Sequence, residues 1–159
     1  MPNPDPGSQG SPFRFLYVED NPDDVFFVRH AFRKAAPQIQ LLAVSDGKAA
    51  QDYLLGAVPF QDRSTHPLPE LVLMDLKLPM MTGLEVLEWM KGQPGLRDIP
   101  VFILSSSSEK PDVERAGSLG ANGYFTKPGS MKALMEIVQR LLDFLSGDGQ
   151  PSTEASARV

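Results

Sequence analysis

The stretch Leu71-Val72-Leu73-Met74-Asp75-Leu76-Lys77-Leu78-Pro79 decides the predicted fold. Four apolar residues run directly into Asp75, Pro69 stands two residues before the stretch, and Pro79 ends it. A short, continuous apolar run between turn signals is typical of a strand that is buried on both faces of a parallel sheet. A carboxylate at the carboxyl end of such a strand lies where open α/β sheets bind their ligands. Asp75 is therefore a candidate functional residue, although by itself it could equally be the first residue of a turn.

The composition of the 159-residue chain excludes several classes of protein. The chain contains no cysteine, which rules out disulfides and cysteine-based metal sites. A net charge of −5 disfavours a nucleic-acid-binding face, which needs clustered lysine and arginine. No apolar run approaches the length of a membrane span, and the N-terminus has neither the basic region nor the apolar core of a signal peptide. We therefore expect a cytoplasmic protein with no nucleic-acid partner and no membrane partner.

Strand and helix patterns alternate along most of the chain, which predicts βαβ units and a doubly wound α/β fold with a parallel sheet. We expect one domain over residues 13–147, between Pro-, Gly- and Ser-rich disordered tails at 1–12 and 148–159. The predicted strands cover residues 13–18, 39–44, 71–75, 100–104 and 123–126. The predicted helices cover residues 22–35, 48–55, 84–91, 112–119 and 130–145. The loop 56–70 is unusually long for such a connection, and its His66 is expected to be solvated and without a role.

Polar side chains follow four of the predicted strands at the point where each strand ends. These residues are Glu19, Asp20, Asp75, Ser105, Ser106 and Lys127. In a doubly wound sheet these ends face the same side, so the three carboxylates would repel one another unless a cation neutralised them. Oxygen ligands without histidine or cysteine favour Mg²⁺ that keeps several waters.

A lysine and a hydroxyl opposite such a metal site supply what a phosphoryl group needs, which is charge compensation and hydrogen-bond donors. Asp75 is then the natural nucleophile, because a carboxylate can accept a phosphoryl group. Each residue alone has an ordinary explanation: acidic pairs cap helices, serine runs form loops, and Lys-Pro forms turns. Their joint placement at four strand ends favours the chemical interpretation.

In order, the motifs resemble those of a response-regulator receiver domain of two-component signalling. They are Val-Glu-Asp-Asn at 18–21, Leu-Met-Asp-Leu-Lys-Leu-Pro at 73–79 with Gly83 eight residues after Asp75, Ile-Leu-Ser-Ser at 103–106, and Tyr-Phe-Thr-Lys-Pro-Gly at 124–129. The resemblance spans residues 13–145 and implies the flavodoxin-like fold, with strand order 2-1-3-4-5 and five flanking helices. More narrowly, residues 19–24, the long loop and residues 99–107 resemble the single-domain regulators that partner bacterial phytochrome-type histidine kinases.

The resemblance implies a role for each acidic residue. Asp75 would accept a phosphoryl group from the phosphohistidine of a sensor histidine kinase. Asp20 and Asp75 would ligate Mg²⁺ together with the backbone carbonyl of Lys77, while Glu19 would act through water. The backbone amide of Lys77 would be a donor to the phosphoryl group.

The resemblance also implies roles for the residues opposite the carboxylates. Lys127 would pair with the phosphoryl oxygens, and the Ser106 backbone amide would be a further donor. Ser105 would be the switch hydroxyl that moves onto the phosphoryl group, and Tyr124 the switch aromatic that turns inward when Ser105 moves. The peptide bond between Lys127 and Pro128 is expected to be cis.

Two residues depart from the common pattern of the family. Lys77 places a long cationic side chain two residues after the acceptor, where it could shield the phosphoryl group or obstruct the hydrolytic water. Ser107, two residues after Ser105, offers no acid or amide to orient that water. Both departures predict slow autodephosphorylation.

The signal is expected to leave by protein contact, because only a short polar tail follows Leu145. Phe26 is a candidate partner surface, since it points away from the arc that is predicted to face the core, formed by Phe27, Val28, Ala31 and Phe32. On the last helix, Ile137 and Phe144 widen the apolar arc to about half the circumference. They are either a partner or dimer face, for which a homodimer is expected, or partly buried edges of the core.

Three functions compete for this sequence. The first is a phosphorylatable switch whose only chemistry is self-phosphotransfer and slow autodephosphorylation. The second is a true phosphatase of the haloacid-dehalogenase kind, which needs a second carboxylate where Lys77 stands. The third is a phosphorylation-independent binding module on the receiver fold, although such modules usually lack one of the residues that are present here.

Overall fold

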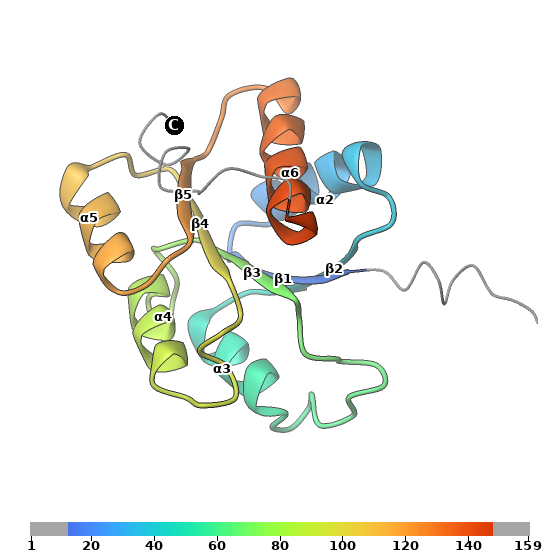
Figure 1. The fold of residues 1–159 in the computed structure, drawn as a ribbon. Helices are drawn as coiled ribbons and strands as arrows, with labels where there is room; N and C mark the ends of the chain where they lie inside the picture. Colours follow the sequence, from blue (N-terminus) through green and yellow to red (C-terminus); the bar gives the residue numbers. More distant parts are fainter. Residues whose placement is uncertain (1–12, 148–159) are drawn as a thin grey trace, which may run out of the picture.

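Five parallel strands form one sheet that lies between two layers of helices in this computed structural model, which describes residues 13–147 (Figure 1). The strands are β1 (Arg14–Val18), β2 (Gln40–Val44), β3 (Leu71–Met74), β4 (Val101–Ser105) and β5 (Gly123–Thr126). The helices are α2 (Pro22–Ala35), α3 (Gly47–Leu55), α4 (Gly83–Lys91), α5 (Lys110–Ser118) and α6 (Met131–Ser146). The expected tails at 1–12 and 148–159 lie outside the described residues.

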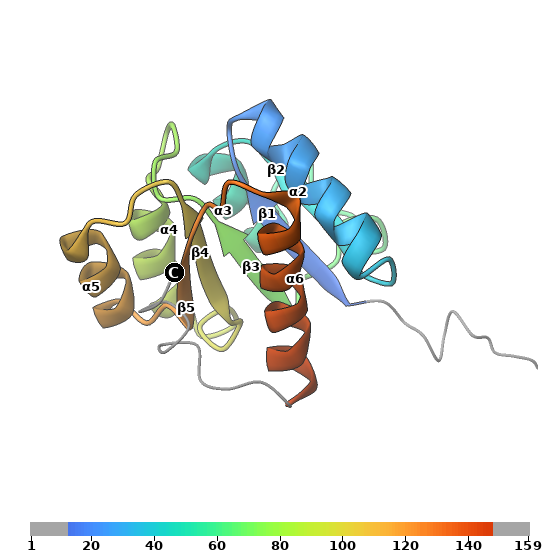
Figure 2. The same cartoon turned by 90° about the horizontal axis from the view of Figure 1, so that it is seen from above.

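The strand order is β2-β1-β3-β4-β5 with every neighbouring pair parallel, as the flavodoxin-like fold requires. Helices α2 and α6 cover one face of the sheet, and α3, α4 and α5 cover the other (Figure 2). The predicted fold class and strand order are confirmed. Predicted element ends agree to within about a residue, except that α5 begins two residues early at Lys110, with Pro111 in the first turn where proline is tolerated.

The core follows the twofold alternation of side chains along each strand. In β3, Leu71 and Leu73 pack toward α2 and α6, whereas Val72 and Met74 pack toward α3, α4 and α5. All four side chains are buried. The stretch that decides the fold is therefore a central strand with two buried faces, and the next residue, Asp75, lies at its carboxyl end.

Helix α6 corrects one predicted partner surface. Ile137 is only 6% exposed and belongs to the core, so its place on a partner face is wrong and the alternative of a core residue holds. Phe144 is half-buried, and its ring packs edge-on against Phe102 of β4 with the ring centroids 5.0 Å apart. The apolar arc of α6 is wide because the helix packs on both the sheet and α2, which requires two adjoining apolar stripes.

Helix α2 presents two phenylalanines to solvent rather than one. Phe26 is 63% exposed, as predicted, whereas Phe27 is 49% exposed and was wrongly assigned to the core. Val28, Ala31 and Phe32 form the buried stripe. Phe27 lies at the margin of that stripe, where it lines a hollow between α2 and α6.

The long loop 56–70 is fastened to the end of α3 by one side chain. The Arg63 guanidinium donates to the carbonyl oxygens of Tyr53 at 2.8 Å, Leu54 at 2.8 Å and His66 at 3.0 Å. The His66 ring packs edge-on against those of Tyr53 and Phe60. His66 is thus half-buried in an aromatic cluster, and the expectation of a merely solvated histidine is wrong.

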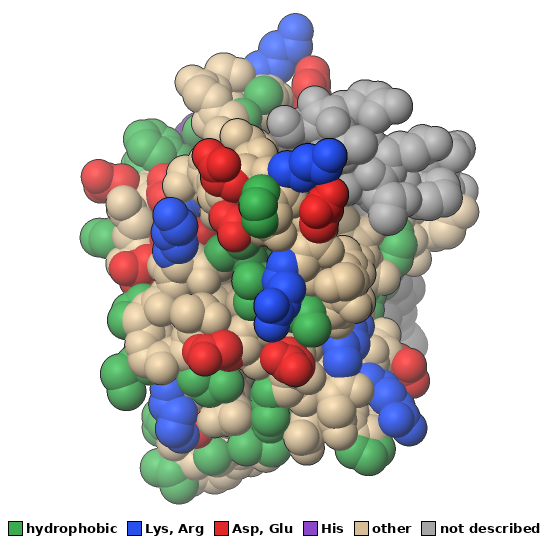
Figure 3. All heavy atoms as spheres, turned by 90° about the vertical axis from the view of Figure 1, so that its left-hand side faces the viewer, with side chains coloured by type: hydrophobic (Ala, Val, Ile, Leu, Met, Phe, Trp, Pro, Cys, Tyr) green, Lys and Arg blue, Asp and Glu red, His purple; other side chains and the backbone are tan. Residues whose placement is uncertain are grey.

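The face of the molecule on the α5 side carries acidic and basic side chains interspersed among hydrophobic ones (Figure 3). Within residues 13–147, none of the helices has the length and apolar character needed to cross a membrane.

Candidate functional site

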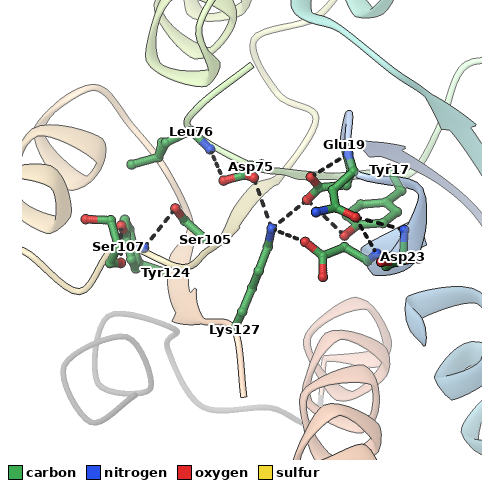
Figure 4. A network of polar contacts seen from close by, with 11 residues as sticks. Tyr17, Glu19, Asp23, Asp75, Leu76, Ser105, Ser107, Tyr124 and Lys127 are labelled. Carbon is green, nitrogen blue, oxygen red and sulfur yellow. Dashed lines mark hydrogen bonds and ion pairs between the residues drawn. The ribbon is translucent and has the colours of Figure 1, made fainter. Parts of the chain in front are cut away.

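The carboxyl ends of four strands bring the predicted site residues to one edge of the sheet. Glu19 follows β1, Asp75 follows β3, Ser105 ends β4 and Lys127 follows β5. The strand order reverses between β1 and β3, which is where open α/β sheets form their binding crevice. Figure 4 shows Glu19 and Tyr17 on one side of the Lys127 ammonium, with Ser105 and Tyr124 on the far side of Asp75.

The Lys127 ammonium forms ion pairs with three carboxylates. Its Nζ lies 2.7 Å from Asp24 Oδ2, 2.8 Å from Glu19 Oε1 and 3.1 Å from Asp75 Oδ2. Figure 4 shows the contacts with Glu19 and Asp75. Burial alone would lower the pKa of Lys127, but the hydrogen bonds to Asp24 and Glu19 and the charge of Asp75 raise it above its usual value. The lysine therefore stays charged at any physiological pH.

Glu19 is buried beneath this ammonium. Its side chain accepts hydrogen bonds from the Tyr17 hydroxyl at 3.3 Å and from the Asn21 backbone amide at 3.1 Å. Burial raises the pKa of Glu19, against the opposing effects of the Lys127 and Asn21 hydrogen bonds. Each neighbouring carboxylate raises the free energy needed to ionise the others. A positive charge that binds among them lowers this cost, so the cluster attracts cations.

Asp75 is held by the turn that follows β3. Its Oδ1 accepts a hydrogen bond from the Leu76 backbone amide at 2.7 Å, while its Oδ2 faces Lys127. Its side chain is only 8% exposed, so little of the carboxylate reaches solvent. The Asp75 carboxylate is thereby fixed by one backbone donor and one cationic donor.

The acidic residues fit a divalent cation. Carboxylate oxygens of Glu19, Asp20 and Asp75 lie within 4.8 Å of one another, and Asp20 is exposed. This all-oxygen donor set, open to solvent on one side, suits Mg²⁺, which binds through one or two carboxylates and keeps several waters. Receiver domains bind Mg²⁺ at such an acidic pocket.

The predicted switch residues form a second group next to Asp75. Ser105 is buried, and its Oγ accepts a hydrogen bond from the Ser107 backbone amide at 3.2 Å. Tyr124 is 2% exposed and donates its hydroxyl hydrogen to the Ser107 carbonyl oxygen at 2.7 Å. The Ser107 hydroxyl donates in turn to Asp112 of α5 at 2.5 Å. The Tyr124 ring is therefore already turned inward in this structure, where an inward turn on activation was expected.

Two other predicted residues lie at the rim. Lys77 and Ser106 are exposed, so the long cationic side chain of Lys77 stands in solvent near Asp75. The Lys127–Pro128 peptide bond is trans, contrary to expectation, and the cis bond among the described residues precedes Pro59. Trans is the ordinary state of an X–Pro bond.

Sequence reasoning missed Asp24 and Tyr17. Asp24 has no predicted role beyond its place in the motif at residues 19–24, and Tyr17 none beyond its place in the first predicted strand. The available signal was that α2 starts directly at the sheet edge, so a carboxylate in its first turn is within reach of that edge. The contact with Lys127 joins residues that are 103 positions apart, which no local pattern reveals.

A hollow of about 340 Å³ opens beside the site between α2 and the start of α6. Its polar end is formed by Asp24 and Lys127. Its apolar wall includes Phe27, Val28, Met131 and Leu134.

Comparisons with known proteins place the site in a family context. A model of the response regulator receiver domain matches residues 15–139, a range that includes every site residue from Glu19 to Lys127. The chain is 36% identical over 136 residues to the probable methanogenesis regulatory protein FilR2 of Methanothrix harundinacea, covering 86% of this chain and 85% of FilR2. It is 34% identical over 129 residues to response regulator Rcp1 of Synechocystis sp., covering 81% of this chain and 86% of Rcp1.

Solved structures of similar proteins share the same arrangement of strands and helices. The phosphorylated cyanobacterial phytochrome response regulator RcpA matches with a TM-score of 0.78 at 30% identity, covering 87% of this chain and 97% of that chain. The Mn²⁺-bound form of Rcp1 matches with a TM-score of 0.74 at 34% identity, covering 84% of this chain and 94% of that chain.

Proposed function

This chain belongs to the response regulator receiver domain family, and on that premise we propose that it is a switch that accepts a phosphoryl group on Asp75 from a sensor histidine kinase. Receiver-domain response regulators are signalling proteins rather than true enzymes. The observation that carries the proposal is the Lys127 ammonium, 3.1 Å from Asp75 Oδ2 and 2.8 Å from Glu19 Oε1. It pairs a carboxylate nucleophile with the charge compensation that a phosphoryl group needs.

In the proposed transfer, a carboxylate oxygen of Asp75 forms the new bond to phosphorus. The bond from phosphorus to the imidazole nitrogen of the donor breaks, and its electron pair stays on the imidazole. Lys127 pairs with the phosphoryl oxygens, and the backbone amides of Lys77 and Ser106 are further donors. The phosphorylated crystal form of the relative RcpA supports this chemistry for a receiver domain of the same fold.

We assign the Mg²⁺ site to the side chains of Asp20 and Asp75 and the backbone carbonyl of Lys77, with Glu19 acting through water. When bound, the ion would supply positive charge to the phosphoryl oxygens. The Mn²⁺-bound form of Rcp1 supports a divalent cation in this family.

We further propose that Ser105 and Tyr124 relay the phosphorylation state to α5. In this proposal the Ser105 hydroxyl turns toward the phosphoryl oxygens. That movement would break the hydrogen bond that Ser105 Oγ now accepts from the Ser107 backbone amide. Ser107 also carries the hydrogen bonds to Tyr124 and Asp112. A change at Ser105 would thus reach the first turn of α5 through one residue.

The decisive experiment is the intact mass of the protein after incubation with acetyl phosphate and Mg²⁺. We expect one hydroxylamine-labile phosphoryl adduct on the wild type. Asp75→Asn, which keeps the size of the side chain, and a sample with excess chelator should show none. If the folded wild type binds Mg²⁺ yet gains no adduct, the proposed switch is wrong and a phosphorylation-independent binding module takes its place.

The proposed kinase partner is of the phytochrome type, because RcpA is named as a phytochrome response regulator. We propose that the exposed Phe26 is part of the kinase-docking surface on α2. Phosphotransfer from a purified bacterial phytochrome kinase should depend on red and far-red light and weaken in Phe26→Ala, whereas acetyl phosphate should load both proteins equally. Equal transfer from the kinase to both proteins would remove Phe26 from the docking surface.

A homodimer and a cytoplasmic location stay part of the proposal. Ile137 can no longer contribute to a dimer face, whereas the partly buried Phe144 can. Light scattering coupled to size-exclusion chromatography, with and without acetyl phosphate, measures the mass of the particle and so tests the dimer.

A further inference from the structure

The three acceptors of Lys127 have different roles, because two of them belong to the acidic cluster and one does not. Glu19 and Asp75 are members of the carboxylate cluster that fits a divalent cation. Asp24 is not a member, and its side chain, 33% exposed, approaches the ammonium from the first turn of α2. The ammonium has three hydrogens, so three acceptors satisfy it completely.

A cation and the ammonium compete for Glu19 and Asp75. Both positive groups are stabilised by the same two carboxylates, and they repel each other at short distance. An ammonium that paired only with Glu19 and Asp75 would neutralise the charge that attracts the metal. Asp24 offers it a third partner at 2.7 Å, the shortest of the three contacts.

The local structure brings both Asp24 and Glu19 within reach of the ammonium. The Asn21 side chain caps α2 by accepting from the backbone amides of Asp23 at 2.8 Å and Asp24 at 3.3 Å. The backbone amide of the same Asn21 donates to Glu19 Oε2 at 3.1 Å. The turn at Asn21 therefore holds both Glu19, which belongs to the metal cluster, and Asp24, which lies outside it.

We propose that Asp24 is a positioning residue that retains the Lys127 ammonium and thereby leaves Glu19 and Asp75 available to the divalent cation. This inference rests on the Mg²⁺ site of the proposed function, and it adds a residue outside the metal cluster to the determinants of metal affinity. Loss of the Asp24 charge should weaken binding of the cation in two ways. The site becomes less negative, and the ammonium pairs more closely with Glu19 and Asp75.

The test is the Mg²⁺ dissociation constant, measured by isothermal titration calorimetry without any phosphodonor. Asp24→Asn should bind Mg²⁺ roughly tenfold more weakly than the wild type, at the low end of the effect of residues that support metal ligands. Asp23→Asn is the matched control, because Asp23 is an exposed aspartate in the same helical turn and the same charge is removed. It should change the affinity much less.

A double-mutant cycle with Lys127→Met separates the action through the ammonium from a general field effect. In the Lys127→Met background there is no ammonium to retain, so Asp24→Asn should have only the small effect of Asp23→Asn. Thermal unfolding of each variant verifies that the fold is kept, and Asp24→Glu should restore most of the affinity.

Equal affinities of Asp24→Asn and Asp23→Asn would overturn the inference while leaving the metal site intact. An undiminished effect of Asp24→Asn in the Lys127→Met background would also overturn it, because the effect would then not pass through Lys127. A wild type that binds no Mg²⁺ would overturn the metal site itself, and this inference with it.

Discussion

Gly83 packs directly against the backbone carbonyl of Asp75, eight residues earlier in the chain. A Cβ atom at Gly83 would collide with that carbonyl oxygen and would lie 2.9 Å from the Cα of Leu76. The Gly83 backbone amide also donates to the Leu76 carbonyl oxygen at 2.8 Å. The start of α4 can therefore approach the acceptor turn only because residue 83 has no side chain.

Gly83→Ala should lower the free energy of unfolding by about 1–3 kcal/mol, because backbone atoms would have to move to accept the methyl group. Gly117→Ala is the control, since a Cβ there has no neighbour within 4 Å and Gly117 lies inside α5. It should stabilise the protein by about 0.5–1 kcal/mol. Urea unfolding measures both. Equal stability of the two variants would show that the acceptor turn adapts to the methyl group.

Lys77→Asn should shorten the lifetime of the phosphorylated protein by about threefold, which corresponds to roughly 0.7 kcal/mol in the barrier. The exposed lysine beside Asp75 would otherwise shield the phosphoryl group from water. The decay of the mass adduct after removal of acetyl phosphate measures the lifetime. Lys132→Asn, which removes an exposed lysine of α6, should leave it unchanged. The idea fails if the two variants decay at the same rate.

Phe27→Ala should cost less than about 1 kcal/mol in stability, although the residue belongs to an apolar helix segment, because its ring is half exposed. Phe32→Ala should cost about 3–5 kcal/mol, because its ring is buried against Phe15 with the ring centroids 5.5 Å apart. Urea unfolding of the two single variants gives the comparison. A loss of stability for Phe27→Ala as large as that for Phe32→Ala would show that the Phe27 ring contributes to the core.

The three tyrosines should resist ionisation as long as the protein is folded. Burial raises the pKa of Tyr17, Tyr53 and Tyr124 above the usual value of 10.0. The folded protein then binds more protons than the unfolded chain above this pH, so the free energy of unfolding falls as the pH rises past about 10. As the pH is raised, the phenolate absorbance of the folded protein should increase at a higher pH than that of the urea-unfolded chain. Coincident titration curves would show that the hydroxyls reach water.

The sequence predicts the sheet edge of the site well, because strand ends are local features. Asp75 and Lys127 were placed correctly by the apolar runs that precede them and by the rule that parallel strands share their carboxyl ends. Asp24 was missed as a partner of Lys127 because the two residues are 103 positions apart and their contact depends on how α2 lies over the sheet, which no local pattern shows.

The errors on helix surfaces have a common cause. An apolar stripe shows that a helix is buried but does not show how many neighbours bury it. Ile137 was proposed for a partner face because the apolar arc of α6 is wider than one core face requires, whereas α6 packs on both the sheet and α2. Phe27 was assigned to the core although it lies at the margin of its stripe.

The contacts of the Lys127 ammonium also limit when the site can form during synthesis of the chain. Its contacts with Asp24 and Asp75 span 103 and 52 positions, so they form only when both ends of the domain have met. A nascent chain that has not yet released β5 from the ribosome carries the carboxylates without their counter-charge. Such a chain carries Glu19, Asp24 and Asp75 without the ammonium that pairs with all three, so the site cannot reach its folded geometry before β5 joins the sheet.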